Sequence, residues 1–226
     1  MKNHHAENVD KHHSLRGADR IDSSGYRSRM KLGGIAVFGL LSIVGNLATS
    51  FLASALHIPI FLDTIFTVAI TFYAGLVPGL IVAVLHNPIR TFIRSVIYGT
   101  DLFYFGSLYA VCGMLIALST WIFSRNKKDF FFNRTVTVLY LLIIVFVSSF
   151  LSCFSASALD TFIRPLLNDS LRFFPIDIFS IPFQKLKFGM FLSYLLPRIP
   201  ITVLDRLICT FSGFGLYRLV ERRISC

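Results

Sequence analysis

Residues 135–159 read TVTVLYLLIIVFVSSFLSCFSASAL, an apolar run without a charged side chain. A helix needs roughly 20 mostly apolar residues to cross the hydrocarbon core of a bilayer, so this run is long enough to cross by itself. The whole chain has the same character, with 54% hydrophobic residues, 15% charged residues and a mean hydropathy of +0.68. One soluble core of 226 residues cannot enclose that much apolar surface. We therefore predict an all-α integral membrane protein.

Five more apolar runs flank this stretch. They cover residues 32–56, 61–76, 77–98, 102–123 and 188–219. Residues 75–79 read GLVPG, a turn signal too short to hold a loop domain, so the two runs that it divides are predicted to form an antiparallel hairpin. The sequence thus predicts six transmembrane helices.

The last apolar run contains two prolines, Pro197 and Pro200. Two arrangements are open: one helix over 188–219 with a break, or a peripheral segment at 188–196 followed by a helix over 199–219. We favour the second, because proline fits the first turn of a helix.

Basic residues outside the predicted spans gather in three groups: Arg16 to Lys31, Arg125 to Arg134 and Arg218 to Arg223. Short cytoplasmic loops carry an excess of Lys and Arg. Six crossings place all three groups on one side, whereas five or seven separate the first group from the last. We therefore predict that both termini lie in the cytoplasm, and that the net charge of +10 reflects topology in the cell membrane rather than binding to nucleic acid.

The predicted membrane domain covers residues 32–220. Residues 1–31 are strongly polar and are predicted to be a disordered cytoplasmic tail, and residues 221–226 a short cytoplasmic C-terminus. The stretch 160–187 mixes prolines, charges and aromatic residues, which favours an extracellular loop that is interfacial or contains short amphipathic helices.

Polar side chains inside the spans are the candidates for function, because they are costly in hydrocarbon and usually line a cavity or pair with one another. We select as solute contacts Asp63, Thr67, Asn87, Arg90, Arg94, Arg198, Thr202 and Asp205. A rise of about 1.5 Å per residue places them in one layer near the outer side, where arginine charge could hold an anionic or carboxylate-bearing solute. Structural ion pairs, Asp63 with Arg90 and Asp205 with Arg206 or Arg198, are the alternative.

Motifs for catalysis are missing from the sequence. It contains no GxxxxGK[ST], HExxH or GxSxG, so we expect neither an ATPase of its own nor a hydrolase, and only His86 beside Asn87 and Arg90 offers a constellation worth testing for chemistry. Cys112, Cys153 and Cys209 fall in apolar runs without CxxC spacing and are expected to be free thiols. We expect no metal and no cofactor.

Three short stretches carry a resemblance to a known family. FLDT at Phe61–Thr64, GLVPG at Gly75–Gly79 and PITVLDRL at Pro200–Leu207 resemble the substrate-binding S component of energy-coupling factor transporters. The resemblance implies six helices with cytoplasmic termini and a pocket near the outer face for a vitamin or similar micronutrient. It also implies three partners, a coupling transmembrane subunit and two ATP-binding subunits.

In that family a small-residue motif on the first span docks on the coupling subunit. The nearest stripe in this sequence is Gly45, Thr49 and Ala53, spaced by four. Small residues at this spacing let helices approach closely, and contact within the same chain is the alternative.

Two other functional classes stay open. A stand-alone secondary transporter would show an inverted repeat or paired broken helices, and no convincing repeat relates residues 33–123 to 135–220. A membrane sensor domain would need a helix beyond the last span to pass on a signal, and that span is expected to end near the C-terminus.

Overall fold

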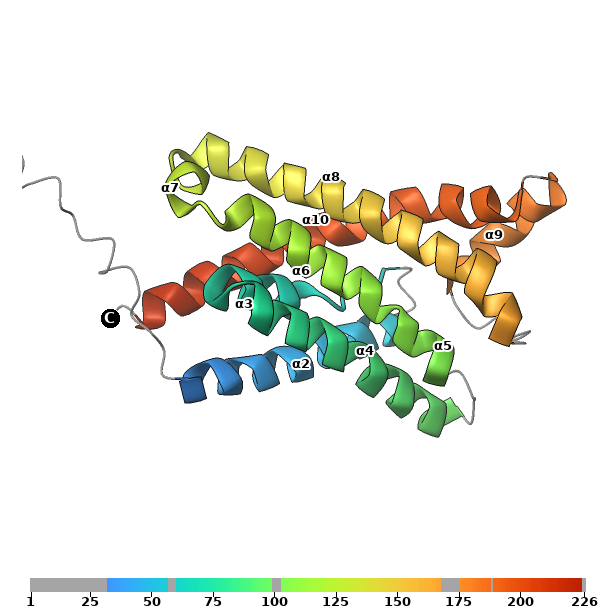
Figure 1. Cartoon of the computed structure of the whole chain (residues 1–226), viewed down its shortest axis with the longest axis horizontal. Coiled ribbons are helices and arrows are strands. Elements are labelled where there is room, and N and C mark those ends of the chain that lie inside the picture. Colours follow the sequence, from blue (N-terminus) through green and yellow to red (C-terminus); the bar gives the residue numbers. More distant parts are fainter. Residues whose placement is uncertain (1–31, 57–59, 99–102, 168–174, 188, 225–226) are drawn as a thin grey trace, which may run out of the picture. The chain divides into compact units, whose positions relative to one another are not determined.

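The computed structural model describes residues 32–56, 60–98, 103–167, 175–187 and 189–224 (Figure 1). The predicted tail, 1–31, lies outside the described residues. The chain divides into the units Met1–Gly34 and Ile35–Cys226, and the arrangement below is that of the second unit. Every regular element in these described ranges is helical: α2 (Leu32–Ala55), α3 (Ile65–Ala74), α4 (Leu76–Tyr98), α5 (Phe103–Leu108), α6 (Ala110–Ser124), α7 (Lys127–Phe130), α8 (Arg134–Ala158), the π-helix η1 (Leu159–Ile163), the 3-10 helix η2 (Arg164–Leu167), α9 (Pro175–Lys185) and α10 (Met190–Ile224).

Five helices in the described ranges are long and apolar enough to cross a membrane. They are Gly33–Ala55, Leu76–Ile97, Gly106–Ser124, Arg134–Leu166 and Met190–Arg223. Each overlaps one predicted span, because a backbone in lipid must satisfy its own hydrogen bonds and an apolar run does so as a helix. The chain is therefore a multi-span, all-α membrane protein.

The second predicted span, 61–76, is wrong in its first part. Helix α3 has 10 residues, Ile65–Ala74, and residues 60–64 are not helical. Leu62 in this segment has φ +46°, in the left-handed region that side chains with a Cβ rarely adopt. The backbone leaves the helical path because side chains from other helices bind its polar groups, as described below.

The turn between α3 and α4 agrees with the predicted hairpin. Only Gly75 separates the two helices, and its φ of +93° is a conformation that glycine adopts without strain. Its N–H donates to the carbonyl of Thr71 at 3.1 Å and closes the last turn of α3.

The predicted division of the last span is wrong, because α10 runs unbroken from Met190 to Ile224 through both Pro197 and Pro200. Each proline removes one N–H from the helical ladder. Membrane helices tolerate this loss where neighbouring helices and side chains satisfy the backbone, and α10 packs against α8 and α9.

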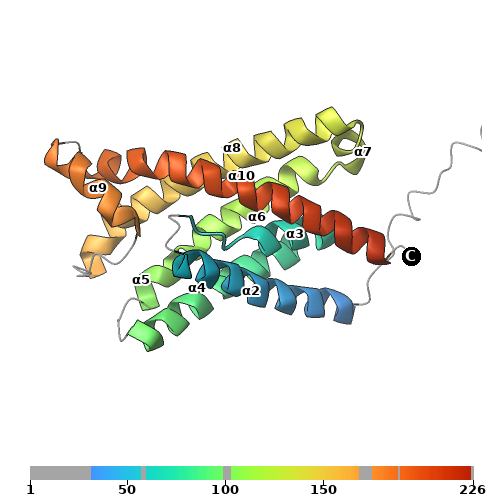
Figure 2. The same cartoon turned by 180° about the vertical axis from the view of Figure 1, so that it is seen from behind.

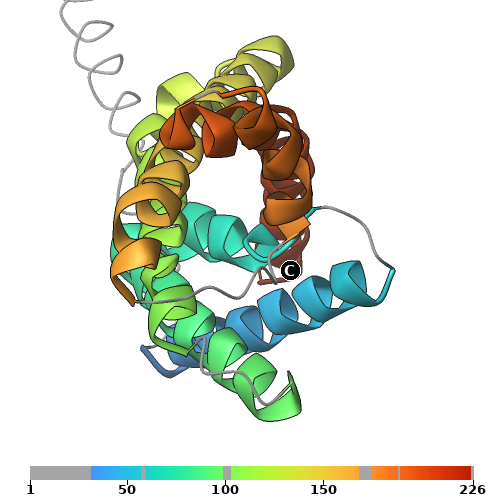
Figure 3. The same ribbon diagram turned by 90° about the vertical axis from the view of Figure 1, so that its right-hand side faces the viewer.

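Helix α3 is the central helix. Its residues Thr67–Phe72 are all buried, and it packs against α4, α6 and α10. Figure 3, which looks along the bundle, shows it among the longer helices, and Figure 2 shows α2 and α10 on the side opposite to Figure 1. At Gly213 of α10, an added Cβ would lie 2.6 Å from the carbonyl oxygen of Ile65, so the absence of a side chain allows the two helices to approach.

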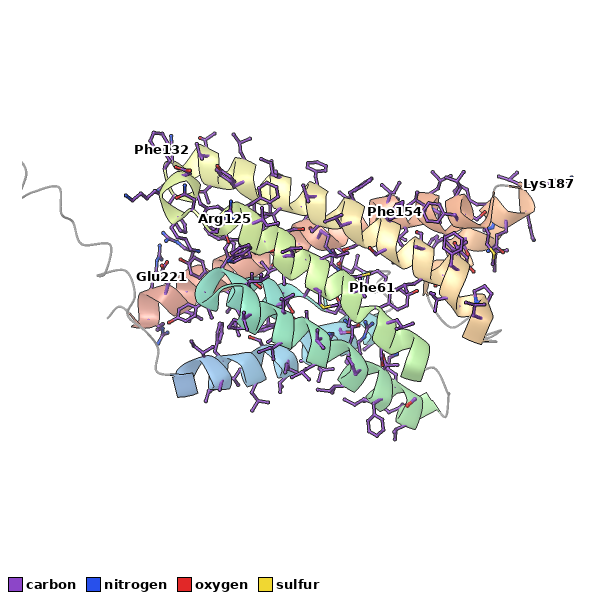
Figure 4. All side chains as sticks on the ribbon, in the orientation of Figure 1. Phe61, Arg125, Phe132, Phe154, Lys187 and Glu221 are labelled. Atoms are coloured by element: carbon purple, nitrogen blue, oxygen red, sulfur yellow. The ribbon has the colours of Figure 1, made fainter. Side chains whose placement is uncertain are left out.

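The two ends of the bundle can be named by residues labelled in Figure 4, Glu221 of α10 and Lys187 after α9. The ring of Phe38, near the start of α2, lies 5.7 Å from the ring of Tyr73, at the end of α3. Tyr217 of α10 stacks on Phe72 at 5.7 Å. The start of α2, the end of α3 and the end of α10 therefore share the Glu221 end.

The apolar core lies at the Glu221 end. Its buried members are Val68, Phe72, Ile116, Phe130, Leu141, Ile144 and Tyr217. Lys127 of α7 enters this cluster: its Nζ donates to the carbonyl of Phe72 at 3.0 Å and lies 5.2 Å from the centroid of the Tyr217 ring. The lysine satisfies a carbonyl at the C-terminal end of α3, where a cation is favourable.

Candidate functional site

Two carboxylates and two guanidinium groups meet beside the start of α3. Arg90 Nη1 lies 3.0 Å from Asp63 Oδ2. Arg206 Nη2 lies 3.6 Å from Asp63 Oδ1 and 2.5 Å from Asp205 Oδ2. Arg206 Nη1 also donates to Thr64 Oγ1 at 2.6 Å. We call Asp63, Thr64, Arg90, Asp205 and Arg206 the Asp63 cluster; its two negative and two positive side chains balance.

The second oxygen of Asp205 binds backbone rather than a cation. Asp205 Oδ1 accepts from the N–H groups of Phe61 and Leu62 at 2.9 and 2.8 Å. Figure 4 shows Phe61 between the two ends of the bundle. An aspartate from the last helix thus replaces the helical carbonyls that these two N–H groups lack.

Two residues of helix α2 bind the unwound stretch and the start of α3. Thr49 Oγ1 donates to the carbonyl of Leu62 at 2.5 Å. Asn46 accepts from the N–H of Phe66 at 3.0 Å and donates to Thr67 Oγ1 at 2.9 Å. Asn46 is therefore an N-cap that comes from a different helix, since the local residue Thr64 makes no side-chain cap.

The proposed docking stripe of α2 takes part in the same contacts. Thr49 binds Leu62, Ala53 is buried, and an added Cβ on Gly45 would lie 2.6 Å from the ring of Phe66. The small side chains thus allow close packing within the chain. Docking of a partner on Gly45, Thr49 and Ala53 stays a prediction.

A second cluster lies about two turns earlier along α10, around Asp160 of η1. Arg198 Nη2 lies 2.5 Å from Asp160 Oδ2, and Arg164 Nη1 lies 3.8 Å from Asp160 Oδ1. The hydroxyl of Tyr109 donates to Asp160 Oδ1 at 2.6 Å. We call these four residues the Asp160 cluster. Asp160 is fully buried, and the cluster joins Tyr109, the residue between α5 and α6, to η1, η2 and α10.

Helical regularity is interrupted where these clusters form. Pro88 lies inside α4 two residues before Arg90, and Asp160 belongs to the five-residue π-helix. Tyr109 separates α5 from α6. Local departures from the α-helix re-aim side chains and free backbone groups, and they are frequent at functional sites.

Several buried polar atoms near the clusters have no hydrogen-bond partner among the described residues. They include Arg198 Nε, Arg206 Nε, His86 Nε2 and Ser152 Oγ. A buried donor or acceptor left unsatisfied costs roughly 1–3 kcal/mol, so such atoms call for a water or a bound solute. Arg198 and Arg206 lie about 12 Å apart along α10.

The predicted solute contacts divide into groups. Asp63, Arg90 and Asp205 come together, whereas Thr67 hydrogen-bonds Asn46 of α2 outside the cluster. Arg198 belongs to the other cluster. The remaining three lie on the same helices: Asn87 and Thr202 are buried on α4 and α10, and Arg94 is half-buried one turn beyond Arg90.

Sequence reasoning missed part of both clusters. Thr64, Tyr109, Asp160 and Arg164 were not selected as solute contacts, and Arg206 was considered only as an ion-pair partner. Tyr109 had no signal, because a tyrosine near the end of a span is ordinary at a membrane interface. Asp160 did have a sequence signal, because it directly follows the uncharged run 135–159. In the structure the helical path continues through it as η1.

An apolar groove lies outside the clusters, on the surface of α6, α8 and η1. It has a volume of about 320 Å³ and is lined by Val111, Phe154, Ser155, Ala158, Leu159, Phe162 and Ile163. Figure 4 labels Phe154 on α8. None of the predicted solute contacts lines it.

Comparison with known proteins gives no match: no family model, no curated protein and no solved structure matches the chain.

Proposed function

We propose that this multi-span membrane protein is a solute-capture subunit of the energy-coupling factor type. It binds a vitamin-like or anionic small molecule from outside the cell membrane and depends on a coupling subunit and two ATP-binding subunits for energy. The observation that carries the proposal is the set of buried, unsatisfied donors and acceptors around the Asp63 and Asp160 clusters. A fold stabilised by ion pairs alone has no need to leave these atoms unsatisfied.

The position of the clusters fits this role. Both lie away from the aromatic core of the Glu221 end, which holds the end of α10 and the basic connector between α6 and α8. With the basic groups in the cytoplasm, the clusters would lie in the outer half of the membrane, where a solute can enter. The missing phosphate-binding loop agrees with dependence on a separate ATPase.

Ligand binding is tested on detergent-purified protein with a thermal-shift screen of vitamins and small carboxylates. A ligand that binds only the native state raises the melting temperature as its concentration rises. For the ligand found, Ser152→Ala should weaken binding, because it removes a buried hydroxyl that has no partner in the described part of the chain.

Ser148→Ala is the matched control for that variant. Ser148 is buried one turn away on α8, but its hydroxyl donates to the carbonyl of Val145 at 3.2 Å. Its removal should leave affinity unchanged. Equal affinity of wild type and Ser152→Ala would argue against a solute at this hydroxyl.

The broken second span favours a second candidate, a secondary transporter that works alone. Transporters of that class bind their solutes at helices interrupted by unwound backbone, and residues 60–74 join an unwound stretch to the short helix α3. Uptake by the purified protein alone in vesicles would support it. Co-purification with a coupling subunit and two ATPases would support the capture subunit.

A further inference from the structure

Residues 60–74 are barely long enough to cross a membrane. Helix α3 has 10 residues and is about 15 Å long, half of the roughly 30 Å hydrocarbon core. The five non-helical residues 60–64 add at most about 17 Å. The segment reaches across the core only if this unwound half stays inside it.

An unwound backbone at that depth needs hydrogen-bond partners, since each unsatisfied group in hydrocarbon costs several kcal/mol. The N–H groups of Phe61 and Leu62 both donate to Asp205 Oδ1. The charge of Asp63 faces Arg90 and Arg206. Leu62, at φ +46°, adds backbone strain that these contacts must also offset.

The partners come from distant parts of the sequence. Asp205 lies 143 and 144 residues after Leu62 and Phe61, and Arg206 lies 142 residues after Thr64. Both belong to α10, which is synthesised long after residues 60–74. Until α10 packs, two backbone donors and part of the Asp63 charge have no partner.

We propose that Asp205 is a trans-acting backbone cap that holds residues 60–74 across the membrane, so that the second span is completed only when α10 is in place. Asp205 is then a positioning residue rather than a solute contact, because Oδ1 binds backbone and Oδ2 binds Arg206. This inference concerns topology and stands whether or not a solute is found.

The test reads which side of the membrane carries the turn after α3. Val77, just past that turn, is 65% exposed, and Val77→Cys is introduced after the four native cysteines are replaced by alanine. An impermeant thiol reagent is applied from each side to intact cells and to inverted vesicles. In the otherwise wild-type chain, labelling should come from the side that carries the C-terminus.

Asp205→Ala should raise labelling from the opposite side at least about tenfold, which corresponds to about 1.4 kcal/mol. Asp205→Asn keeps an acceptor oxygen for the two N–H groups and should label like wild type. Leu204→Ala, at a 54% exposed neighbour on the same helix, is the matched control and should also label like wild type.

Labelling is read on pulse-labelled chains within minutes of synthesis, so that unstable variants are still counted. Wild-type labelling of Asp205→Ala would overturn the proposal, because the span would then cross without its cap. Equal effects of Asp205→Asn and Asp205→Ala would also overturn it, because the charge rather than the acceptor would hold the span.

Discussion

At the scale of single residues, the charges of the Asp63 cluster balance, whereas the Asp160 cluster holds one carboxylate and two guanidinium groups. In the Asp63 cluster two carboxylates face two guanidinium groups. These contacts agree with the alternative prediction of structural ion pairs, Asp63 with Arg90 and Asp205 with Arg206. Pairing does not by itself stabilise a fold, because the desolvation of buried charges offsets their attraction. It does make the loss of one partner costly, since the other charge stays behind.

Arg206 is the residue whose loss should cost most, because it contacts both Asp63 and Asp205. We expect Arg206→Met to lower the free energy of unfolding by about 3–5 kcal/mol, as measured by denaturant titration in mixed micelles. Arg218→Met is the control: Arg218 pairs with Glu221 at 3.0 Å but is 44% exposed, and the change should cost at most about 1 kcal/mol. Similar losses in both variants would contradict the assignment.

Lys127 gives the protein a pH dependence outside the spans. Burial lowers the pKa of Lys127 to about 8 from its ordinary 10.5, and the charge of Glu221 opposes this shift. Between these values the unfolded chain binds a proton that the folded protein has released, so the free energy of unfolding should rise with pH. Below about 8 the lysine is protonated in both states and contributes no slope.

The measurement is the thermal midpoint of wild type and Lys127→Met across that range. Subtracting the thermal midpoint of Lys127→Met from that of wild type removes the contribution of tyrosines that ionise at similar pH. The difference between the two proteins should change with pH above about 8 and be flat below it. A difference that is flat throughout would show that the pKa of Lys127 is not lowered.

At the scale of elements, the unusual segment is residues 60–74, an unwound stretch followed by the short helix α3. Its helical half is capped at both ends by side chains from elsewhere, Asn46 at the start and Lys127 at the end. Its unwound half is bound by α2, α4 and α10. A helix this short is only marginally stable by itself, so tertiary contacts hold it in position.

The strain at Leu62 can be measured by comparing two truncations of its side chain. Alanine and glycine both remove the leucine contacts, but only glycine adopts φ +46° without a Cβ penalty. Leu62→Gly should therefore be more stable than Leu62→Ala by about 1 kcal/mol. At Leu204, a lipid-facing position within α10, the order should reverse by about the same amount. If the alanine variant were more stable than the glycine variant at both positions, the backbone at Leu62 would not be strained.

At the scale of the whole molecule, the fold separates an aromatic end from a charged half. The Glu221 end is packed with aromatic rings, whereas the two charge clusters lie where helices are interrupted. Helix α2 is the most lipid-exposed of the candidate spans, with 22% of its apolar window buried against 44% for the span that contains α8. Its outward face is thus the one most available to lipid or to a partner.

The whole-molecule prediction concerns topology. If residues 60–74 complete a sixth crossing, both termini lie on the cytoplasmic side. Reporters fused to the N-terminus and to the C-terminus, one active only in the cytoplasm and one only outside, should give the cytoplasmic signal at both positions. Opposite signals would mean five crossings and would place α3 as a segment that does not traverse the bilayer.

The sequence by itself determined the class of protein and five of its spans. Long apolar runs have one low-energy form in lipid, the helix, so their positions follow from composition alone. The same local logic predicted the turn at Gly75 and placed Asp63, Arg90 and Asp205 among the functional candidates. Only the tertiary structure decided that Ile60–Thr64 unwinds, that α10 continues through two prolines, and that Tyr109 and Asp160 join Arg198. Those outcomes depend on hydrogen bonds and ion pairs between residues up to 144 positions apart, which no local pattern contains.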